Sequence, residues 1–131
     1  MKKLIIGLAG VAAMTLGMAS AAVAADKTKV CFVYVGSKTD GGWTQAHDIG
    51  RQEVETHFGD KVETAFIENV AEGPQATAVI ERFARAKCNI IFTTSFGFMD
   101  PTLEVAAKFP DVKFEHATGY KTADNVTSYN P

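Results

Sequence analysis

The sequence has no excess of positive charge, and this absence excludes whole classes of partner. Its 131 residues carry 13 lysines and arginines against 15 aspartates and glutamates, which gives a net charge of −2. Proteins that bind nucleic acid or anionic lipid through electrostatics need clustered basic residues. We therefore expect no nucleic-acid partner and no adhesion to an anionic membrane surface.

Residues that carry catalysis or bind metals are also scarce. The chain has three histidines and two cysteines. His47 and His57 lie nearly three turns apart on a predicted helix, so they cannot ligate one metal, and His116 stands alone near the end of a predicted strand. Residues 93–97 lack the first glycine of a nucleophile elbow, and no carboxylate pair stands out. We predict no catalytic residue, no metal site and no cofactor.

The chain does contain an export signal. Two lysines follow the initiator methionine, and an uncharged apolar run extends over residues 4–18. Small residues close the run, and Ala22 and Ala24 satisfy the cleavage rule for a secretory signal. A membrane-spanning helix needs about 20 apolar residues, more than this run holds. The sequence predicts a signal peptide over residues 1–25.

The mature protein is predicted to diffuse freely outside the cytoplasm. No cysteine follows the apolar run at the distance that a lipoprotein signal requires, so we expect a periplasmic protein without a lipid anchor. Cleavage removes Lys2 and Lys3 and leaves 11 basic residues against 15 acidic ones, a net charge of about −4. Residues 26–131 are enough for one small domain.

The mature chain alternates between two hydrophobic periods. Continuous β-branched and aromatic runs are typical of buried strands, and apolar residues at i, i+3, i+4 and i+7 are typical of helices. Short connections between them predict right-handed βαβ units and a parallel sheet, an α/β Rossmann-like lobe. Strands are expected at 29–35, 61–67, 89–94 and 112–116, and helices at 43–58, 74–87 and 100–109.

The pattern makes specific predictions for two of the helices. The first helix is predicted to bury one apolar face and to end at Gly59; the face consists of Ala46, Ile49, Gly50, Val54 and Phe58. The third helix is predicted to start at Asp100 as N-cap, followed by Pro101.

The last residues suggest an incomplete lobe. Residues 121–131 are polar with one valine, and we predict a loop there. The fourth strand therefore lacks an outgoing helix, although parallel sheets normally carry helices on both faces. We interpret residues 26–131 as an incomplete α/β lobe.

Candidate binding residues lie in the loops that follow the strands, where open α/β sheets bind ligands. These loops are residues 36–44, 68–73 and 95–100. The first does not match a phosphate-binding glycine pattern, but it carries Asp40 and Trp43. Asp40 either accepts hydrogen bonds from a ligand or caps the next helix, and Trp43 either stacks on a ligand or packs beneath the loop.

The third loop is similar in kind. Phe96 and Phe98 flank Gly97 directly after a buried strand, and Ser95 supplies a hydroxyl group. An aromatic side chain here either lines the binding cleft or packs in the core.

Four strings of the sequence resemble the basic membrane protein (BMP, PnrA-like) family of ABC transporter substrate-binding proteins. They are Phe32–Gly36, Asp40–Thr44, Ile91–Phe98 and Phe109–Phe114, and the resemblance extends from about Lys29 to the end of the chain. It implies one lobe of a periplasmic-binding-protein type I fold, with the second lobe absent here. It also implies a purine nucleoside or base as ligand, a membrane permease as partner, work at the inner membrane, and a monomeric full-length protein.

The resemblance also implies a set of ligand-binding residues. Asp40 and Trp43 match the acid and the stacking aromatic of the family's loop, and Thr44 stands where asparagine is usual. Gly97 and Phe98 match its glycine–aromatic pair, with Ser95 beside them.

The strand–helix alternation and the resemblance together predict the strand order 2-1-3-4. This order places Cys31 and Cys88 on neighbouring strands, at the amino edge of the sheet. Adjacent strands lie about 4.8 Å apart, near the separation that a disulfide accepts. Either a structural disulfide or two close thiols is expected.

Three other functions remain open on the sequence alone: an exported α/β enzyme, a sugar-binding protein of the same fold, and a ligand-sensing subunit that signals to a receptor. The absence of a catalytic set disfavours the enzyme.

Overall fold

The computed structural model describes residues 26–131, and the predicted signal peptide lies outside them. Strands and helices alternate along the chain, with two single-turn 3-10 helices at Gly59–Lys61 and Phe96–Phe98. The elements are β1 (Thr28–Val33), α1 (Trp43–Phe58), β2 (Val62–Ile67), α2 (Pro74–Arg85), β3 (Ile90–Thr93), α3 (Met99–Lys108), β4 (Lys113–Ala117) and β5 (Val126–Tyr129). No helix within the described residues is long and apolar enough to cross a membrane.

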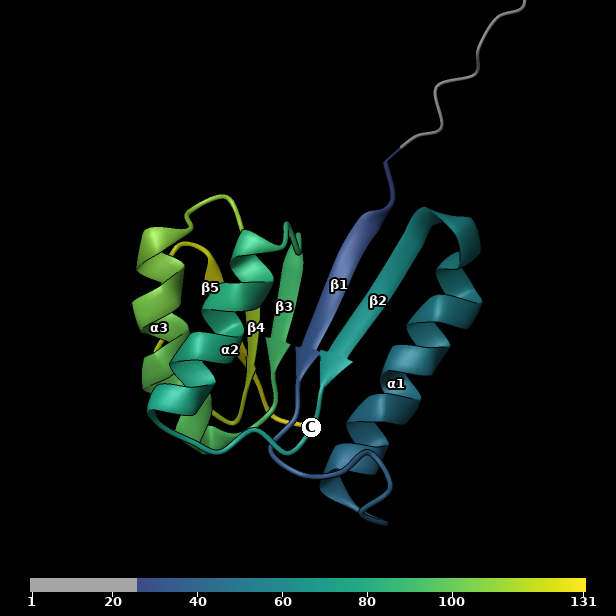
Figure 1. The fold of residues 1–131 in the computed structure, drawn as a ribbon, viewed down its shortest axis with the longest axis horizontal. Helices are drawn as coiled ribbons and strands as arrows, with labels where there is room; N and C mark the ends of the chain where they lie inside the picture. Colours follow the sequence, from purple (N-terminus) through teal and green to yellow (C-terminus); the bar gives the residue numbers. More distant parts are fainter. Residues whose placement is uncertain (1–25) are drawn as a thin grey trace, which may run out of the picture.

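The strands form one parallel sheet in the order β2-β1-β3-β4-β5. The predicted order 2-1-3-4 is therefore confirmed, and a fifth strand extends it. All strand arrows point the same way (Figure 1), so the three candidate loops meet at one end of the sheet, here called the carboxyl edge.

The prediction of a loop over residues 121–131 is wrong for its second half. Val126–Tyr129 pairs with β4, and Val126 is buried in the core. The side-chain amide of Asn125 fixes this segment, because it donates to the main-chain carbonyls of Ala106 and Phe109 at the end of α3. The short Val-Thr-Ser-Tyr strand has too few apolar residues to be recognised, and these tertiary contacts decide its conformation.

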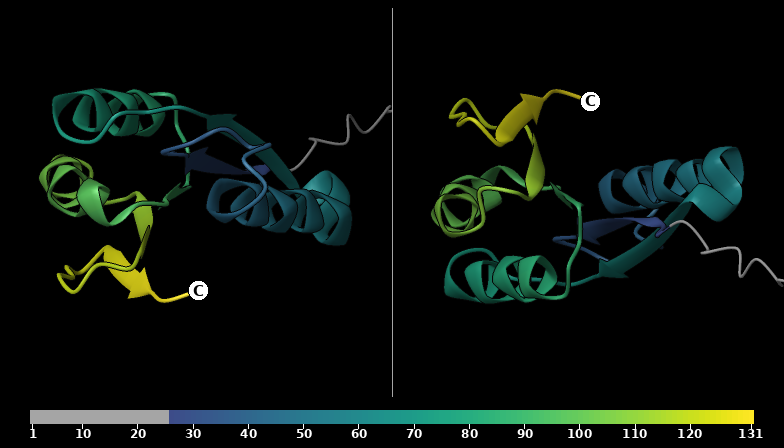
Figure 2. Two further views of the ribbon diagram at one scale, coloured as in Figure 1. Left: turned by 90° about the horizontal axis from the view of Figure 1, so that it is seen from below. Right: turned by 90° about the horizontal axis from the view of Figure 1, so that it is seen from above.

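Helices cover the two faces of the sheet unequally (Figure 2). Right-handed crossovers place α2 and α3 on one face and α1 on the other. Between the sheet and the α2/α3 pair lies a continuous apolar core that includes Cys31, Val33, Ile80, Phe83, Ile91, Phe98, Val105 and Phe114. The opposite face buries only a small cluster around Val30, Phe32 and Tyr34.

Cys31 and Cys88 are joined by a disulfide on the α2/α3 face, with their Cα atoms 6.0 Å apart. Of the two expected alternatives, a disulfide or two close thiols, the structure has the disulfide. Because Cys88 precedes β3, the bond lies away from the candidate loops. It links β1 to the connection between α2 and β3.

The first helix packs differently from the prediction. Its buried residues are Thr44, Asp48 and Arg51, whereas Ile49 and Phe58 of the predicted apolar face are about half exposed. The reason is that Tyr34 and Thr64 on the sheet offer polar partners to the side of the helix that carries Asp48 and Arg51.

The third helix starts two residues earlier than predicted. Met99 is its first residue, and Phe98 is the N-cap position without a side-chain capping bond. Asp100 is therefore not the N-cap as predicted. It lies exposed in the first turn and accepts a hydrogen bond from Lys121 Nζ at 2.7 Å.

Candidate functional site

Asp40 organises the first loop at the carboxyl edge. Its carboxylate accepts hydrogen bonds from the main-chain N–H groups of Gly42 (2.8 Å), Thr44 (3.0 Å) and Gln45 (3.0 Å). These donors lie at or next to the start of α1, and their hydrogen bonds lower the pKa of Asp40. The geometry supports the capping alternative, because both carboxylate oxygens already have backbone partners.

Trp43 connects the first loop to the third. Its indole Nε1 donates to the carbonyl oxygen of Thr94 at 2.7 Å, across 51 positions of sequence. The ring lies 4.7 Å from the His47 ring, and the residue is 40% exposed. One hydrogen bond thus holds a partly open aromatic side chain at the carboxyl end of β3.

Thr44 lies beneath the loop and does not face solvent. It is fully buried, and its Oγ1 has no hydrogen-bond partner within the described part of the chain. A Cβ atom on Gly36 would come within 3.0 Å of that oxygen, so the loop closes tightly over Thr44. The structure therefore places Thr44 as a packing residue next to Asp40 and Trp43.

The third loop contributes polar groups through a residue that sequence reasoning missed. Glu72 Oε1 accepts hydrogen bonds from Ser95 Oγ at 2.5 Å and from the main-chain N–H of Gly97 at 3.2 Å. A Cβ atom at position 97 would overlap the Glu72 carboxylate, which explains the glycine there. Glu72 thus joins the second and third loops.

The two aromatic residues of the third loop differ in burial. Phe98 was expected to line the cleft, but it is fully buried in the core. Phe96 is 56% exposed and lies 6.3 Å from the exposed ring of Tyr120. The two rings stand at the two ends of a single-turn 3-10 helix, Phe96–Phe98, and only Phe98 enters the core.

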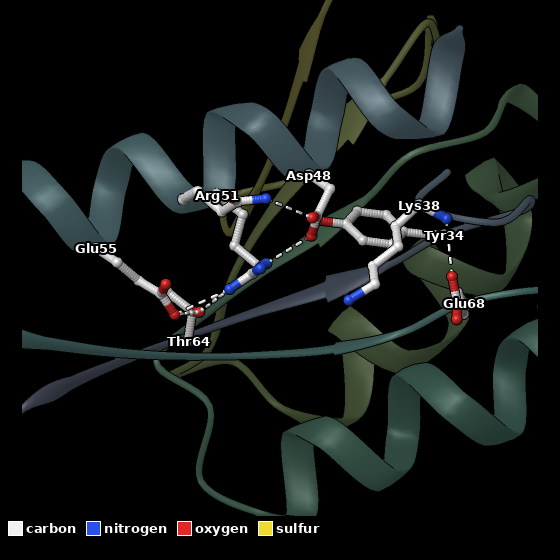
Figure 3. A network of polar contacts seen from close by, with 8 residues as sticks. Tyr34, Lys38, Asp48, Arg51, Glu55, Thr64 and Glu68 are labelled. Carbon is white, nitrogen blue, oxygen red and sulfur yellow. Dashed lines mark hydrogen bonds and ion pairs between the residues drawn. The ribbon is translucent and has the colours of Figure 1, made fainter. Parts of the chain in front are cut away.

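A second acidic residue also follows β2. Glu68 Oε2 accepts a hydrogen bond from the main-chain N–H of Lys38 at 2.8 Å, which fixes the first loop to the second (Figure 3). Glu68 directly follows β2 and Glu72 lies in the same loop, and this position is the signal that could have identified them. Sequence reasoning included their loop but selected neither residue.

A buried polar network holds α1 against the sheet (Figure 3). Asp48 accepts from Tyr34 Oη at 3.2 Å and from Arg51 Nε at 2.7 Å. Arg51 also binds Glu55 and Thr64, both at 2.9 Å. Burial disfavours the charged form of Asp48, but the hydrogen bonds from Arg51 and Gln52 outweigh it, so its pKa is lowered. The network fixes the helix whose first turn carries Trp43.

No group of three or more His, Cys, Asp or Glu side chains within residues 26–131 could hold a metal ion. His116 is buried, with Nδ1 3.0 Å from Thr93 Oγ1, and burial lowers its pKa. What the carboxyl edge offers is a flat aromatic surface at Trp43 flanked by acidic side chains, an arrangement suited to binding.

Comparisons with known proteins agree with this geometry. A family model described as "ABC transporter substrate-binding protein PnrA-like" matches residues 27–130. A purine-binding protein of Brucella abortus is 60% identical over 123 residues, which are 94% of this chain and 35% of the relative. A candidate glucose-binding protein of an ABC transporter in Haloferax volcanii is 39% identical over 104 residues, 79% of this chain and 26% of the relative.

Solved structures show the same fold at low sequence identity. A solute-binding protein of an ABC transporter from Conexibacter woesei superimposes with a TM-score of 0.72 at 22% identity, covering 79% of this chain and 35% of that one. One from Aeropyrum pernix gives a TM-score of 0.67 at 20% identity, over 78% and 28% of the two chains. The chain thus spans about a third of the length of the relatives that it matches, and it belongs to the PnrA-like family of ABC transporter substrate-binding proteins.

Proposed function

We propose that this chain carries half of the ligand-binding cleft of a solute-binding protein that serves an ABC importer, with a purine nucleoside or purine base as ligand. The observation that carries the proposal is Trp43, whose indole is fixed by the Thr94 carbonyl yet remains 40% exposed at the carboxyl edge. A purine can stack on such a ring. The 60% identity with a purine-binding relative supports the same ligand class.

In this role the chain binds and releases a small molecule and carries out no reaction. It works in the periplasm, hands its ligand to a membrane permease at the inner membrane, and is monomeric when joined to its second lobe. Of the predicted site residues, Trp43 is the one that we propose to face the ligand. Asp40, Thr44, Ser95, Gly97 and Phe98 shape the loops around it, and Glu72, which accepts a hydrogen bond from the buried Ser95, joins the site as an acceptor.

A sugar is the second candidate ligand. The Haloferax relative supports it, since its name gives glucose as the ligand and it is 39% identical to this chain. Aromatic faces flanked by carboxylates suit sugar hydroxyls as well as purine rings. A purine presents a flat ring to Trp43 and a sugar presents hydroxyl groups, so binding measurements with both can distinguish the two candidates.

Trp43 is the only tryptophan in the sequence, so its fluorescence reports the proposed site directly. We suggest titrating the purified chain with adenine, adenosine and guanosine, and in parallel with ribose and glucose. Purines should quench the emission and saturate. Small-ligand sites bury most of the ligand, and this lobe supplies one wall, so we expect dissociation constants near the millimolar range, or about −4 kcal/mol.

The outcomes separate the candidates. Saturable quenching by glucose or ribose but not by purines would show that the ligand is a sugar and not a purine. Conversion of adenosine to a new product would support the exported enzyme. Free N-acetyltryptophanamide, titrated in parallel with the same purines, serves as the blank for their inner-filter effects.

A further inference from the structure

The hydrogen bond between Trp43 and the third loop does not by itself set the tilt of the indole. Nε1 donates to the carbonyl oxygen of Thr94 at 2.7 Å, which restrains one edge of the ring at the carboxyl end of β3. The ring plane can still turn about that edge. A ligand that stacks on the ring binds more tightly when the orientation of the ring is set before it arrives. A second contact is therefore needed to hold the indole at one angle.

His47 makes such a contact. It lies four residues after Trp43 on α1, and residues four apart share one side of a helix. The centroids of the two rings are 4.7 Å apart, and their planes are tilted by 53°. Aromatic rings attract each other at this separation and tilt. The imidazole therefore lies against one side of the indole, while Trp43 as a whole stays 40% exposed.

The imidazole is held in place by the main chain of Trp43. His47 Nδ1 lies 2.8 Å from the Trp43 carbonyl oxygen. A carbonyl oxygen can only accept, so Nδ1 carries a proton and donates it to this bond. The hydrogen bond ties the imidazole to the backbone of the residue whose side chain it contacts, and the two rings are linked in two ways.

Tyr129 on β5 approaches the same imidazole. Its ring centroid lies 6.3 Å from that of His47 and 6.2 Å from that of Phe92 on β3. The three side chains belong to an apolar groove of about 310 Å³ on the α1 face, lined by Phe32, Ala46, His47, Gly50, Val54, Phe92, Tyr129 and Pro131. His47 Nε2 is shielded from solvent and has no hydrogen-bond partner among the described residues. Within this part of the chain, no polar contact draws the imidazole away from the indole.

We propose that His47 is a positioning residue for ligand binding, which holds the Trp43 indole at the angle at which a purine stacks on its open side. The inference rests on the proposed function, since Trp43 is the residue proposed to face the ligand. His47 itself does not contact the ligand. Its ring lies against the indole, and its Nδ1 proton is engaged by the Trp43 carbonyl.

The alternative role for His47 is to stabilise the fold. The structure argues against a large contribution of this kind, because the residue is only half-buried and makes one side-chain hydrogen bond within residues 26–131. Alanine is also the best helix former, so His47→Ala should leave α1 intact. The effect of the substitution should therefore appear in ligand binding and not in the melting temperature.

A double-mutant cycle tests whether His47 acts through Trp43. The protein is a chimera in which this chain replaces the 60%-identical segment of the Brucella protein. Calorimetry uses whichever of adenine, adenosine and guanosine the unsubstituted chimera binds most tightly. His47→Ala should weaken binding about two- to tenfold, as expected for the loss of an aromatic pair. In a chimera that already carries Trp43→Ala, it should cause no further loss, because the ring that it positions is gone.

Two further variants separate the ring contact from other effects. His57→Ala is the matched control, because His57 is an exposed histidine of the same helix whose ring lies beside Phe58. It should leave the affinity unchanged. His47→Phe keeps a ring beside the indole but cannot donate to the Trp43 carbonyl, so it should restore most of the affinity that His47→Ala loses.

The emission of Trp43 tests the contact without a ligand. Trp43 is the only tryptophan in the sequence, so acrylamide quenching of this chain reports access to one indole. His47→Ala should raise the quenching constant, because acrylamide then reaches both sides of the ring. It should also lower the emission anisotropy, because the ring moves more freely. His57→Ala should change neither quantity.

Unchanged quenching and anisotropy in His47→Ala would overturn the proposal. Full affinity in His47→Ala would do the same. Equal losses from His47→Ala with and without Trp43 would also contradict it, since the two residues would then act independently. If the unsubstituted chimera binds none of the purines, the proposed function fails, and the emission measurements still decide whether His47 holds the ring.

Discussion

The two faces of the sheet are held together by different kinds of interaction. The α2/α3 face buries a continuous apolar core and a disulfide. The α1 face instead relies on the network around Asp48 and Arg51, and beside that network lies an open groove. We infer that the first face carries most of the stability of the lobe. The second face positions Trp43 and leaves an apolar groove open among the described residues.

Matched phenylalanines on neighbouring strands provide the sharpest test of this difference. Phe114 is fully buried on the α2/α3 face, and Phe92 lies at the groove on the α1 face. Phe114→Ala should lower the free energy of unfolding by about 3–5 kcal/mol, the usual cost of emptying a packed core. Phe92→Ala should cost roughly half as much, since the ring lacks contacts on one side. Equal losses of unfolding free energy in the two variants, measured by urea denaturation, would contradict the difference between the two faces.

The disulfide should contribute nearly as much. It closes a loop with a sequence separation of 57, for which chain-entropy arguments give roughly 4 kcal/mol. We expect the double substitution Cys31→Ala and Cys88→Ala to lower the free energy of unfolding by about 2–4 kcal/mol without weakening purine binding. Thiol titration of denatured, unreduced protein checks the bond itself, and two free thiols would contradict it.

The polar network on the α1 face should give a smaller loss. Asp48→Ala leaves Arg51 and the Tyr34 hydroxyl without their shared acceptor, and we expect about 2–3 kcal/mol of destabilisation. Replacing both members of the pair with leucine should restore most of it, because no buried charge then remains. If the double variant is as unstable as Asp48→Ala, the network contributes folding stability beyond the pairing of its buried charges.

Trp43 and Asp40 should affect binding more than folding. Trp43→Ala should weaken purine binding by about 1–3 kcal/mol, as for other aromatic platforms. Asp40→Asn should leave binding unchanged, since asparagine also caps helices and the carboxylate already serves backbone donors. Both can be measured by calorimetry on a chimera in which this chain replaces the 60%-identical segment of the Brucella protein. A large loss of binding affinity in Asp40→Asn would mean that the Asp40 carboxylate contacts the ligand.

The smallest expected effect is a dependence on pH. The pKa of Asp48 is lowered in the folded state. The contribution of its charge to folding stability is therefore complete above the unfolded pKa of about 3.9. It is lost as the pH falls through the lower, folded value. The stability difference between wild type and Asp48→Asn should therefore narrow between about pH 5 and pH 2. A difference that stays constant over this range would mean that Asp48 does not act through its charge.

The sequence was sufficient to predict the sheet and the loops that meet at its carboxyl edge. Long apolar runs such as Val30–Val35 and proline-initiated helices such as α2 carry strong local signals, and parallel topology follows from their alternation. β5 was missed because its stability comes from pairing with β4 and from Asn125, not from its own composition.

The site was harder to predict, since each side chain there had two possible roles. Asp40 could cap or bind, and Phe98 could line the cleft or fill the core. Only packing distinguishes the two roles, and it buries Phe98 while Phe96, at the other end of the same 3-10 turn, stays exposed. Glu72 gave no signal in the sequence beyond its position after β2, because its importance arises from contacts 23 and 25 residues away.

The position of β5 has a consequence for the dynamics of the lobe. It is an edge strand with one hydrogen-bonded neighbour, and residues 118–125 reach it without a covering helix. Such segments open locally at a lower free energy than the whole domain. Amide hydrogens of Val126–Tyr129 should therefore exchange with deuterated solvent before those of β1 and β3. Each opening would remove Tyr129 from the groove and leave Trp43 and its carbonyl partner in place.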